Sequence, residues 1–264
     1  MVDRDTPWPP GTPCWVDLLT GDLGTARLFY EQLFGWAFSA AGDPELTGGY
    51  EIATLHGKNV AGAMAQGAEQ ADHPSVWTVY LAVEDVAKTA EAIAAAGGTV
   101  LMPVTPVMDA GVMALASDPA GAVFGVWQAK EHTGFQKANE TGSVIWNETL
   151  SRDFAKAKAF YASVFGYTYT DMSADGFEYA TIEVNGNTVG GIGALPAEVP
   201  AEVPAHWRTY FVVDDADETV DEAVKRDAVL IRPPQDMPYG RHADLQDPTG
   251  AYFAILKPVD PNAG

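Results

Sequence analysis

The stretch Thr12–Phe38, TPCWVDLLTGDLGTARLFYEQLFGWAF, decides the fold, because a second copy of it begins at Gly142 and reads GSVIWNETLSRDFAKAKAFYASVFGYTY. Trp15 aligns with Trp146, so the second copy lies 131 residues further along the chain. A repeat of this length indicates a duplicated domain and not a short solenoid unit.

The match continues to the ends of both halves. Trp77–Leu81, WTVYL, aligns with WRTYF, and Asp118–Ala122, DPAGA, aligns with DPTGA, at nearly the same offset. The length of 264 residues also suits two medium domains. We therefore predict a first domain over 1–130, a linker over 131–141 and a second domain over 142–264.

A fainter repeat lies within each half. Four strand-like runs each lead to an aspartate that can cap a helix, and these are Asp22, Asp85, Asp153 and Asp215. The helices after Asp22 and Asp153 should stop at Gly35 and Gly166. Short strand-like pieces follow each helix, so the unit is a strand, a helix and three strands, present four times. The loops 66–74 and 197–204 join these units, and we expect connectors there and not lids.

Composition restricts the partners. Hydrophobic residues make up 47% of the chain and the net charge is −21, which describes a globular acidic protein. Nucleic acid and anionic membranes require clustered basic side chains, so neither is expected. Cys14 is the single cysteine, and no leader or membrane span is visible, which predicts a cytoplasmic protein.

With these motifs in hand, the sequence resembles the vicinal oxygen chelate (VOC) superfamily of glyoxalases, bleomycin-resistance proteins and extradiol dioxygenases. The resemblance rests on strand-x-x-Asp-helix-Phe-Tyr-x-x-x-Phe-Gly and on Asp-Pro-x-Gly-x-x-Phe, each present in both halves. It implies an α+β fold in which four βαβββ modules form two tandem glyoxalase-like domains with curved mixed sheets and cup-shaped cavities. The duplicated form is similar to actinobacterial 27 kDa antigens and to hydroxylase-like proteins of antibiotic gene clusters.

The resemblance also implies where a metal would bind. In the family pattern the first ligand stands seven residues before the capping aspartate, and a glutamate stands seven residues after the aspartate of Asp-Pro. These positions hold Trp15, Thr78, Trp146, Arg208, Gly125 and Ala254. None is a good donor for a divalent cation, and the five histidines are scattered. We therefore predict no metal and no cofactor.

Strand alternation indicates which side chains face the cups instead. The first strands present Trp15, Asp17 and their counterparts, and the final strands add further aromatic residues. The ligand-binding candidates are Trp15, Thr78, Trp127, Trp146, Arg208 and Tyr252. The four aromatic side chains among them have flat faces that suit a planar ligand, although the same rings could instead pack on one another and close the cups.

A carboxylate occupies the same cup-facing position in both halves. Glu148 could pair with Arg208 or accept from Tyr210, and Asp17 could accept from Tyr80 or Thr78. An unpaired carboxylate in an aromatic pocket would have a raised pKa and could transfer protons. The catalytic candidates are Asp17, Glu148, Tyr80, Tyr210 and His242. Because His242 and its neighbour Arg241 break the repeat symmetry, the second half is the better candidate for a specialised site.

Three functions agree with these features. The first is a metal-independent protein that binds a hydrophobic or aromatic natural product for sequestration or resistance. The second is a metal-free tailoring enzyme of antibiotic or polyketide biosynthesis, and the third is a kinase-binding regulatory protein, which the resemblance alone implies. Four modules complete both cups within one chain, so a monomer or a homodimer is expected.

Overall fold

The computed structural model describes residues 2–70, 73–174 and 176–259 and contains two eight-stranded sheets, one from each half. Masked positions therefore leave small parts of the 66–74 loop and of both predicted domains outside the described residues. The first half consists of β2 (Pro13–Thr20), α1 (Leu23–Phe34), β3 (Ala37–Ala40), β4 (Glu51–Leu55), β5 (Lys58–Ala65), β6 (Val76–Ala82), α3 (Val86–Ala95), β7 (Thr99–Val107), β8 (Gly111–Ser117) and β9 (Val123–Ala129).

The second half repeats this order. It consists of β11 (Val144–Ser151), α4 (Phe154–Phe165), β12 (Thr168–Asp171), β13 (Tyr179–Val184), β14 (Asn187–Ala194), β15 (His206–Val212), α5 (Ala216–Val224), β16 (Val229–Met237), β17 (Gly240–Gln246) and β18 (Tyr252–Pro258). Additional short elements are β1 (Val2–Asp3), α2 (Pro44–Thr47), a 3-10 helix (Ala68–Gln70) and β10 (Lys137–Ala138). The four predicted units of one strand, one helix and three strands are all present.

Each sheet is mixed and open. The strand order of the first is β3-β4-β5-β2-β6-β9-β8-β7, and the second sheet has the equivalent order. The central strands β2 and β6 run antiparallel, whereas β2 pairs with β5 and β6 with β9 in parallel. Two modules therefore meet at the middle of each sheet, which confirms the predicted α+β fold of four βαβββ modules in two tandem units.

The predicted residues cap and end the helices. Asp22, Asp85, Asp153 and Asp215 each accept hydrogen bonds from backbone N–H groups of the first turn, which satisfies donors that a helix leaves open. Gly35 ends α1 at φ 70° and Gly166 ends α4 at the same φ, a left-handed conformation that glycine adopts without strain. Among the described residues, no helix is long and apolar enough to cross a membrane.

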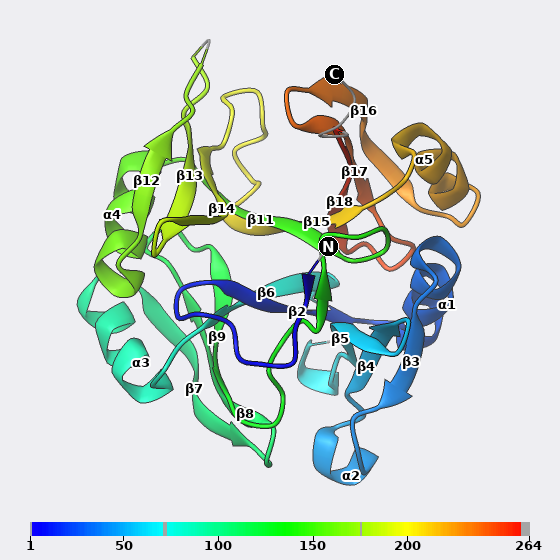
Figure 1. Cartoon of the computed structure of the whole chain (residues 1–264), viewed down its shortest axis with the longest axis horizontal. Helices are drawn as coiled ribbons and strands as arrows, with labels where there is room; N and C mark the ends of the chain where they lie inside the picture. Colours follow the sequence, from blue (N-terminus) through cyan, green and yellow to red (C-terminus); the bar gives the residue numbers. More distant parts are fainter. Residues whose placement is uncertain (1, 71–72, 175, 260–264) are drawn as a thin grey trace.

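The two halves pack against each other through a common core. Figure 1 shows α1 beside α5 and α3 beside α4, with the central strands of both sheets between them. Trp77 of β6 contacts Phe211 of β15 with ring centroids 5.5 Å apart, so aromatic side chains of both sheets fill the space between them. The cup-facing sides of the sheets consequently point away from one another.

Two equivalent hydrogen-bonded chains join the halves. The Tyr30 hydroxyl of α1 donates to Asp247 Oδ2 of the other half at 2.9 Å and accepts from Trp77 Nε1. In the equivalent place, the Tyr161 hydroxyl donates to Asp118 Oδ2 at 3.3 Å and accepts from the Trp207 indole. The tyrosine of Phe-Tyr and the aspartate of Asp-Pro-x-Gly therefore bind the halves together.

Candidate functional site

Glu148 lies at the centre of the second cup. It stands on β11 opposite Arg208 of β15, as the register of these antiparallel strands requires. Its Oε2 accepts from Tyr179 Oη at 2.7 Å, and its Oε1 accepts from Tyr210 Oη at 2.8 Å and from Arg208 Nε at 2.9 Å. The structure thus realises both pairings that the sequence allowed for this carboxylate.

The arginine extends this network across the cup. Arg208 Nη1 lies 3.3 Å from Asp244 Oδ2 and donates to the Tyr252 hydroxyl at 3.3 Å, while Arg232 Nε approaches Asp244 from the outer strand β16. Glu148 and Asp244 are 3% and 1% exposed. Burial opposes ionisation of Glu148, but the Arg208 guanidinium and the donated hydrogen bonds outweigh it and lower the pKa of this carboxyl.

Aromatic rings surround the network. Trp146 Nε1 donates to the Tyr179 hydroxyl at 3.0 Å, and the Arg208 guanidinium lies 4.9 Å from the Tyr210 ring centroid. His242 is 2% exposed beneath Tyr239, and its Nδ1 has no hydrogen-bond partner among the described residues. Burial lowers the pKa of His242, so its imidazole is neutral at physiological pH.

The first cup has the same frame without the ion pair. Trp15 Nε1 donates to the Tyr50 hydroxyl at 2.8 Å, and that hydroxyl donates to Asp17 Oδ2 at 3.4 Å. Thr78 faces Asp17 across the strand pair, in the place that Arg208 has in the second half. Burial raises the pKa of Asp17 to about 7, although the hydroxyls of Tyr80 and Tyr50 act in the opposite direction.

The linker covers part of the first cup. His132 lies edge-on to Trp15 at a centroid distance of 4.4 Å, Phe135 lies 5.6 Å from the same indole, and Trp127 Nε1 donates to the His132 carbonyl. Trp15 and Trp127 are only 4% and 7% exposed. These two candidate stacking residues pack against the protein itself, whereas Trp146 and Tyr252 keep partial exposure.

Sequence reasoning missed Tyr50, Tyr179 and Asp244. The two tyrosines precede or begin strands outside the quoted motifs, and Asp244 lies on β17 before the Asp-Pro motif, where no motif marks it. A signal existed in the glycines, because a Cβ at Gly62 or Gly191 would overlap the tyrosine hydroxyl above it. Two glycines at equivalent strand positions can indicate that a large side chain crosses the sheet there.

The residues at the family's metal position do not fit a divalent cation. A Cβ at Gly125 would overlap the Tyr80 ring, and the Arg208 guanidinium occupies the corresponding region of the second cup. No group of three histidine, cysteine, aspartate or glutamate side chains suited to a metal occurs in the described part of the chain. Metal ligation needs several converging donors, and the residues at these positions do not supply them.

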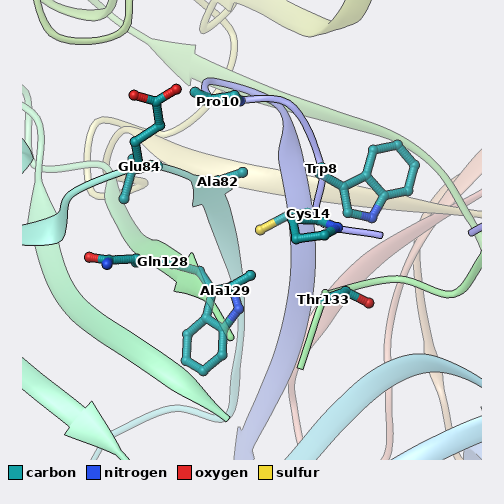
Figure 2. A pocket seen from close by; sticks show the side chains of 11 residues that line it. Trp8, Pro10, Cys14, Ala82, Glu84, Gln128, Ala129 and Thr133 are labelled. Atoms are coloured by element: carbon teal, nitrogen blue, oxygen red, sulfur yellow. The ribbon is translucent and has the colours of Figure 1, made fainter. Parts of the chain in front are cut away.

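A separate cavity of about 310 Å³ opens where the N-terminal segment meets the ends of β6 and β9 (Figure 2). Trp8 and Pro10 line one side, and the Cys14 thiol points toward the space between Ala82 and Ala129. Burial raises the pKa of this thiol, so it remains protonated and unreactive. Of the predicted site residues, Trp127 alone lines this cavity.

Comparison with known proteins agrees with the fold of two tandem domains. The model of the Glyoxalase/Bleomycin resistance protein/Dioxygenase superfamily matches residues 14–126 and 148–255. The chain belongs to this superfamily. It is 43% identical to CFP32 of Mycobacterium tuberculosis, which is provisionally named a glyoxylase, over 94% of this chain and 95% of the relative. It is 34% identical to the anthracycline biosynthesis protein DnrV of Streptomyces peucetius, over 96% and 95%.

Solved structures of this superfamily share the fold. The 2,3-dioxygenase LapB of Pseudomonas sp. KL28 has a TM-score of 0.63 at 13% identity and covers 99% of this chain and 97% of its own. The Mn(II)-bound glyoxalase of Novosphingobium aromaticivorans has a TM-score of 0.62 at 15% identity, with coverages of 95% and 84%. At these identities the likeness concerns the fold of the VOC domains and not their chemistry.

Proposed function

We propose that the second cup of this VOC protein binds a planar aromatic small molecule without a metal ion. The observation that carries the proposal is a set of partly exposed rings around a buried, fully paired polar centre. Trp146, Tyr179 and Tyr252 are half-buried, and Phe177 and Tyr239 are 42% and 48% exposed. Mostly apolar walls with a few fixed polar groups are typical of small-molecule sites.

The ion-pair network holds the hydrogen-bonding groups of this cup in place. Arg208 and Glu148 fix the hydroxyl groups of Tyr179, Tyr210 and Tyr252, so these do not have to be ordered when a ligand binds. Phe177 and Tyr179 are stacked with centroids 5.8 Å apart, which presents a partly exposed flat surface. A planar ligand with phenolic or carbonyl oxygens suits this combination of rings and hydroxyls.

The relatives support the ligand class. DnrV and the protein DauV from Streptomyces sp. strain C5 are both named for anthracycline biosynthesis, and each matches this chain over most of its length. By analogy we propose a polycyclic aromatic natural product or intermediate as the ligand, bound for sequestration or resistance.

A metal-free tailoring enzyme is the second candidate, and His242 favours it. A neutral imidazole whose Nδ1 has no partner among the described residues, located near the salt bridge between Arg208 and Asp244, is suited to accept a proton from a bound phenol. His242→Gln would then abolish turnover of a phenolic substrate and leave its binding within about threefold of wild type, a difference too small to indicate lost binding energy.

Quinizarin, a planar dihydroxyanthraquinone, provides a direct test of binding. Titration should quench tryptophan fluorescence, and Trp146→Leu should weaken binding by about tenfold or more through lost stacking area. Trp8→Leu, a matched change outside both cups, should leave the affinity unchanged.

Binding should also survive exhaustive treatment with a chelator. A chelator-sensitive affinity would contradict the metal-free part of the proposal. Equal affinities of wild-type and Trp146→Leu protein would contradict the assignment to the second cup.

A further inference from the structure

The first cup contains a carboxylate for which the described part of the chain supplies no cation. In the second half, Glu148 receives the guanidinium of Arg208 from the facing strand. In the first half, the equivalent carboxylate of Asp17 faces Thr78, and no salt bridge to Asp17 occurs among the described residues. The two halves therefore have a carboxylate at the equivalent position, and only the carboxylate of the second half is paired with a cation.

The remaining partners of the arginine are also replaced. Leu115 pairs with Gly125 in the first sheet, as Asp244 pairs with Ala254 in the second, so an apolar side chain stands where the second acid would be. Val123 takes the place of Tyr252 at the start of the last strand and is 43% exposed. The surroundings of Asp17 thus combine one acidic group with partly exposed apolar side chains.

Aromatic groups complete these surroundings. The hydroxyl of Tyr50 donates to Asp17, and the rings of Trp15 and Tyr80 stand beside it on the same face. Asp17 and Thr78 are themselves partly exposed, so neither residue is sealed from solvent. Aromatic rings attract cations through their negative faces, and a carboxylate forms strong charge-assisted hydrogen bonds with N–H donors.

We propose that the first cup binds a small organic cation, an ammonium or guanidinium group on an apolar body. The charged group takes the place of the missing arginine and donates to Asp17 and to the Thr78 hydroxyl. The apolar body lies against Leu115 and Val123. This site is separate from the aromatic site proposed for the second cup, because the two cup faces point in opposite directions.

Such a site has a defined pH dependence. The titratable groups facing Asp17 are Tyr50 and Tyr80, with the buried Cys14 thiol close to Tyr80, and all three are neutral near pH 7. His132, which packs on Trp15, is neutral as well, because burial lowers its pKa to about 4. The ionised fraction of Asp17, whose pKa is about 7, therefore sets the affinity for a cation between pH 6 and pH 8. The ionised fraction, and with it the affinity for the cation, rises roughly tenfold between pH 6 and pH 8.

Calorimetric titration of the full chain with phenethylammonium and with phenethylguanidinium tests the proposal. Either probe should bind more tightly at pH 8 than at pH 6 by about tenfold, and the neutral alcohol of the same shape should bind at least about tenfold more weakly than the ammonium at pH 8. Comparison of the two probes identifies which cation the cup prefers.

Two substitutions in the first cup test whether the cation binds there. Asp17→Asn should weaken the ammonium by at least about tenfold at pH 8, and Thr78→Arg should abolish binding by supplying an internal cation. Asp221→Asn removes an equal charge from the exposed side of α5 and should leave the affinity unchanged. Because Asp17→Asn and Thr78→Arg change different residues, either variant can serve for the test if the other fails to fold.

Two results would overturn the proposal. One is absence of binding of both cations at pH 8, and the other is equal ammonium affinity in wild-type protein and Thr78→Arg. Quinizarin titration of the same samples reports separately on the second cup, so failure of one site is distinguishable from failure of the other.

Discussion

The two cups share the same hydrogen-bonded arrangement of a tryptophan, a tyrosine and an acid, but they differ in the charges around that acid. Trp15, Tyr50 and Asp17 in the first half form the same chain of hydrogen bonds as Trp146, Tyr179 and Glu148 in the second. The second half adds Arg208 and Asp244 and becomes a neutralised, rigid network. The first half has Thr78 and Leu115 there and retains a carboxylate with a raised pKa. Duplication has thus preserved the geometry and changed the charge.

Glu148→Gln should have the largest effect on stability. The change breaks a buried ion pair and leaves Arg208 without its main partner, which costs about 3–5 kcal/mol. Because the folded-state pKa of Glu148 is lowered, its contribution is present above the unfolded value near 4.5 and is lost as pH falls. Urea unfolding at pH 7 and pH 4 measures both effects. Glu91→Gln, on the exposed side of α3, should change the free energy of unfolding by less than about 0.5 kcal/mol.

Tyr30→Phe should have the next largest effect, because it breaks a connection between the halves. It leaves Asp247 Oδ2 and the Trp77 indole N–H without their shared hydroxyl, which should destabilise the protein by about 2–3 kcal/mol. Tyr161→Phe should cost less, since its hydroxyl lies 3.3 Å from Asp118 whereas Tyr30 lies 2.9 Å from Asp247. Thermal unfolding of both variants would show a single transition if the halves unfold together. Equal stability of wild-type protein and Tyr30→Phe would show that these hydrogen bonds do not stabilise the folded protein.

Asp17→Asn should have the smallest effect and the opposite sign. The folded-state pKa of Asp17 is raised from 3.8 to about 7, so the folded protein binds a proton more tightly than the unfolded chain, and stability falls as pH rises between these values. The asparagine variant should therefore be more stable than wild type at pH 8 by about 1–2 kcal/mol, less than the full pKa difference would give, because Asp17 is partly exposed and water screens its charge. At pH 4 the two proteins should be nearly equal in stability. A variant less stable than wild type at pH 8 would indicate an unrecognised cation beside Asp17. Together with Glu148→Gln, this measurement shows whether the two acids differ as their surroundings predict.

Much of the fold was predictable because its signals are local or repeated. The capping aspartates, the terminating glycines and the repeat at an offset of 131 residues predict the order of elements without tertiary information. Strand alternation placed Asp17 and Glu148 on the cup faces and offered Arg208 and Tyr210 as partners for Glu148. Alternation suffices there because the paired residues lie opposite each other on neighbouring strands.

Contacts between distant parts of the chain could not be predicted from strand alternation or local motifs. The Tyr30–Asp247 bond joins residues 217 positions apart, and no local pattern specifies which half an aspartate will meet. His132 and Phe135 lie in the predicted linker, yet they pack on Trp15, which is only 4% exposed. A linker's packing depends on the surface across which it runs, and that surface exists only after both sheets have formed.

The sequence by itself determined the duplicated VOC architecture, the position of one acid in each cup and the absence of suitable donors at the family's metal positions. These follow from periodicity and residue chemistry, which are properties of the chain. Only the tertiary structure decided the state of each acid, because a pKa depends on the charges and the burial around the group. Arg208 reaches Glu148 from the neighbouring strand and also pairs with Asp244, whereas no cation contacts Asp17 among the described residues. Two equivalent carboxylates therefore acquire opposite pKa shifts.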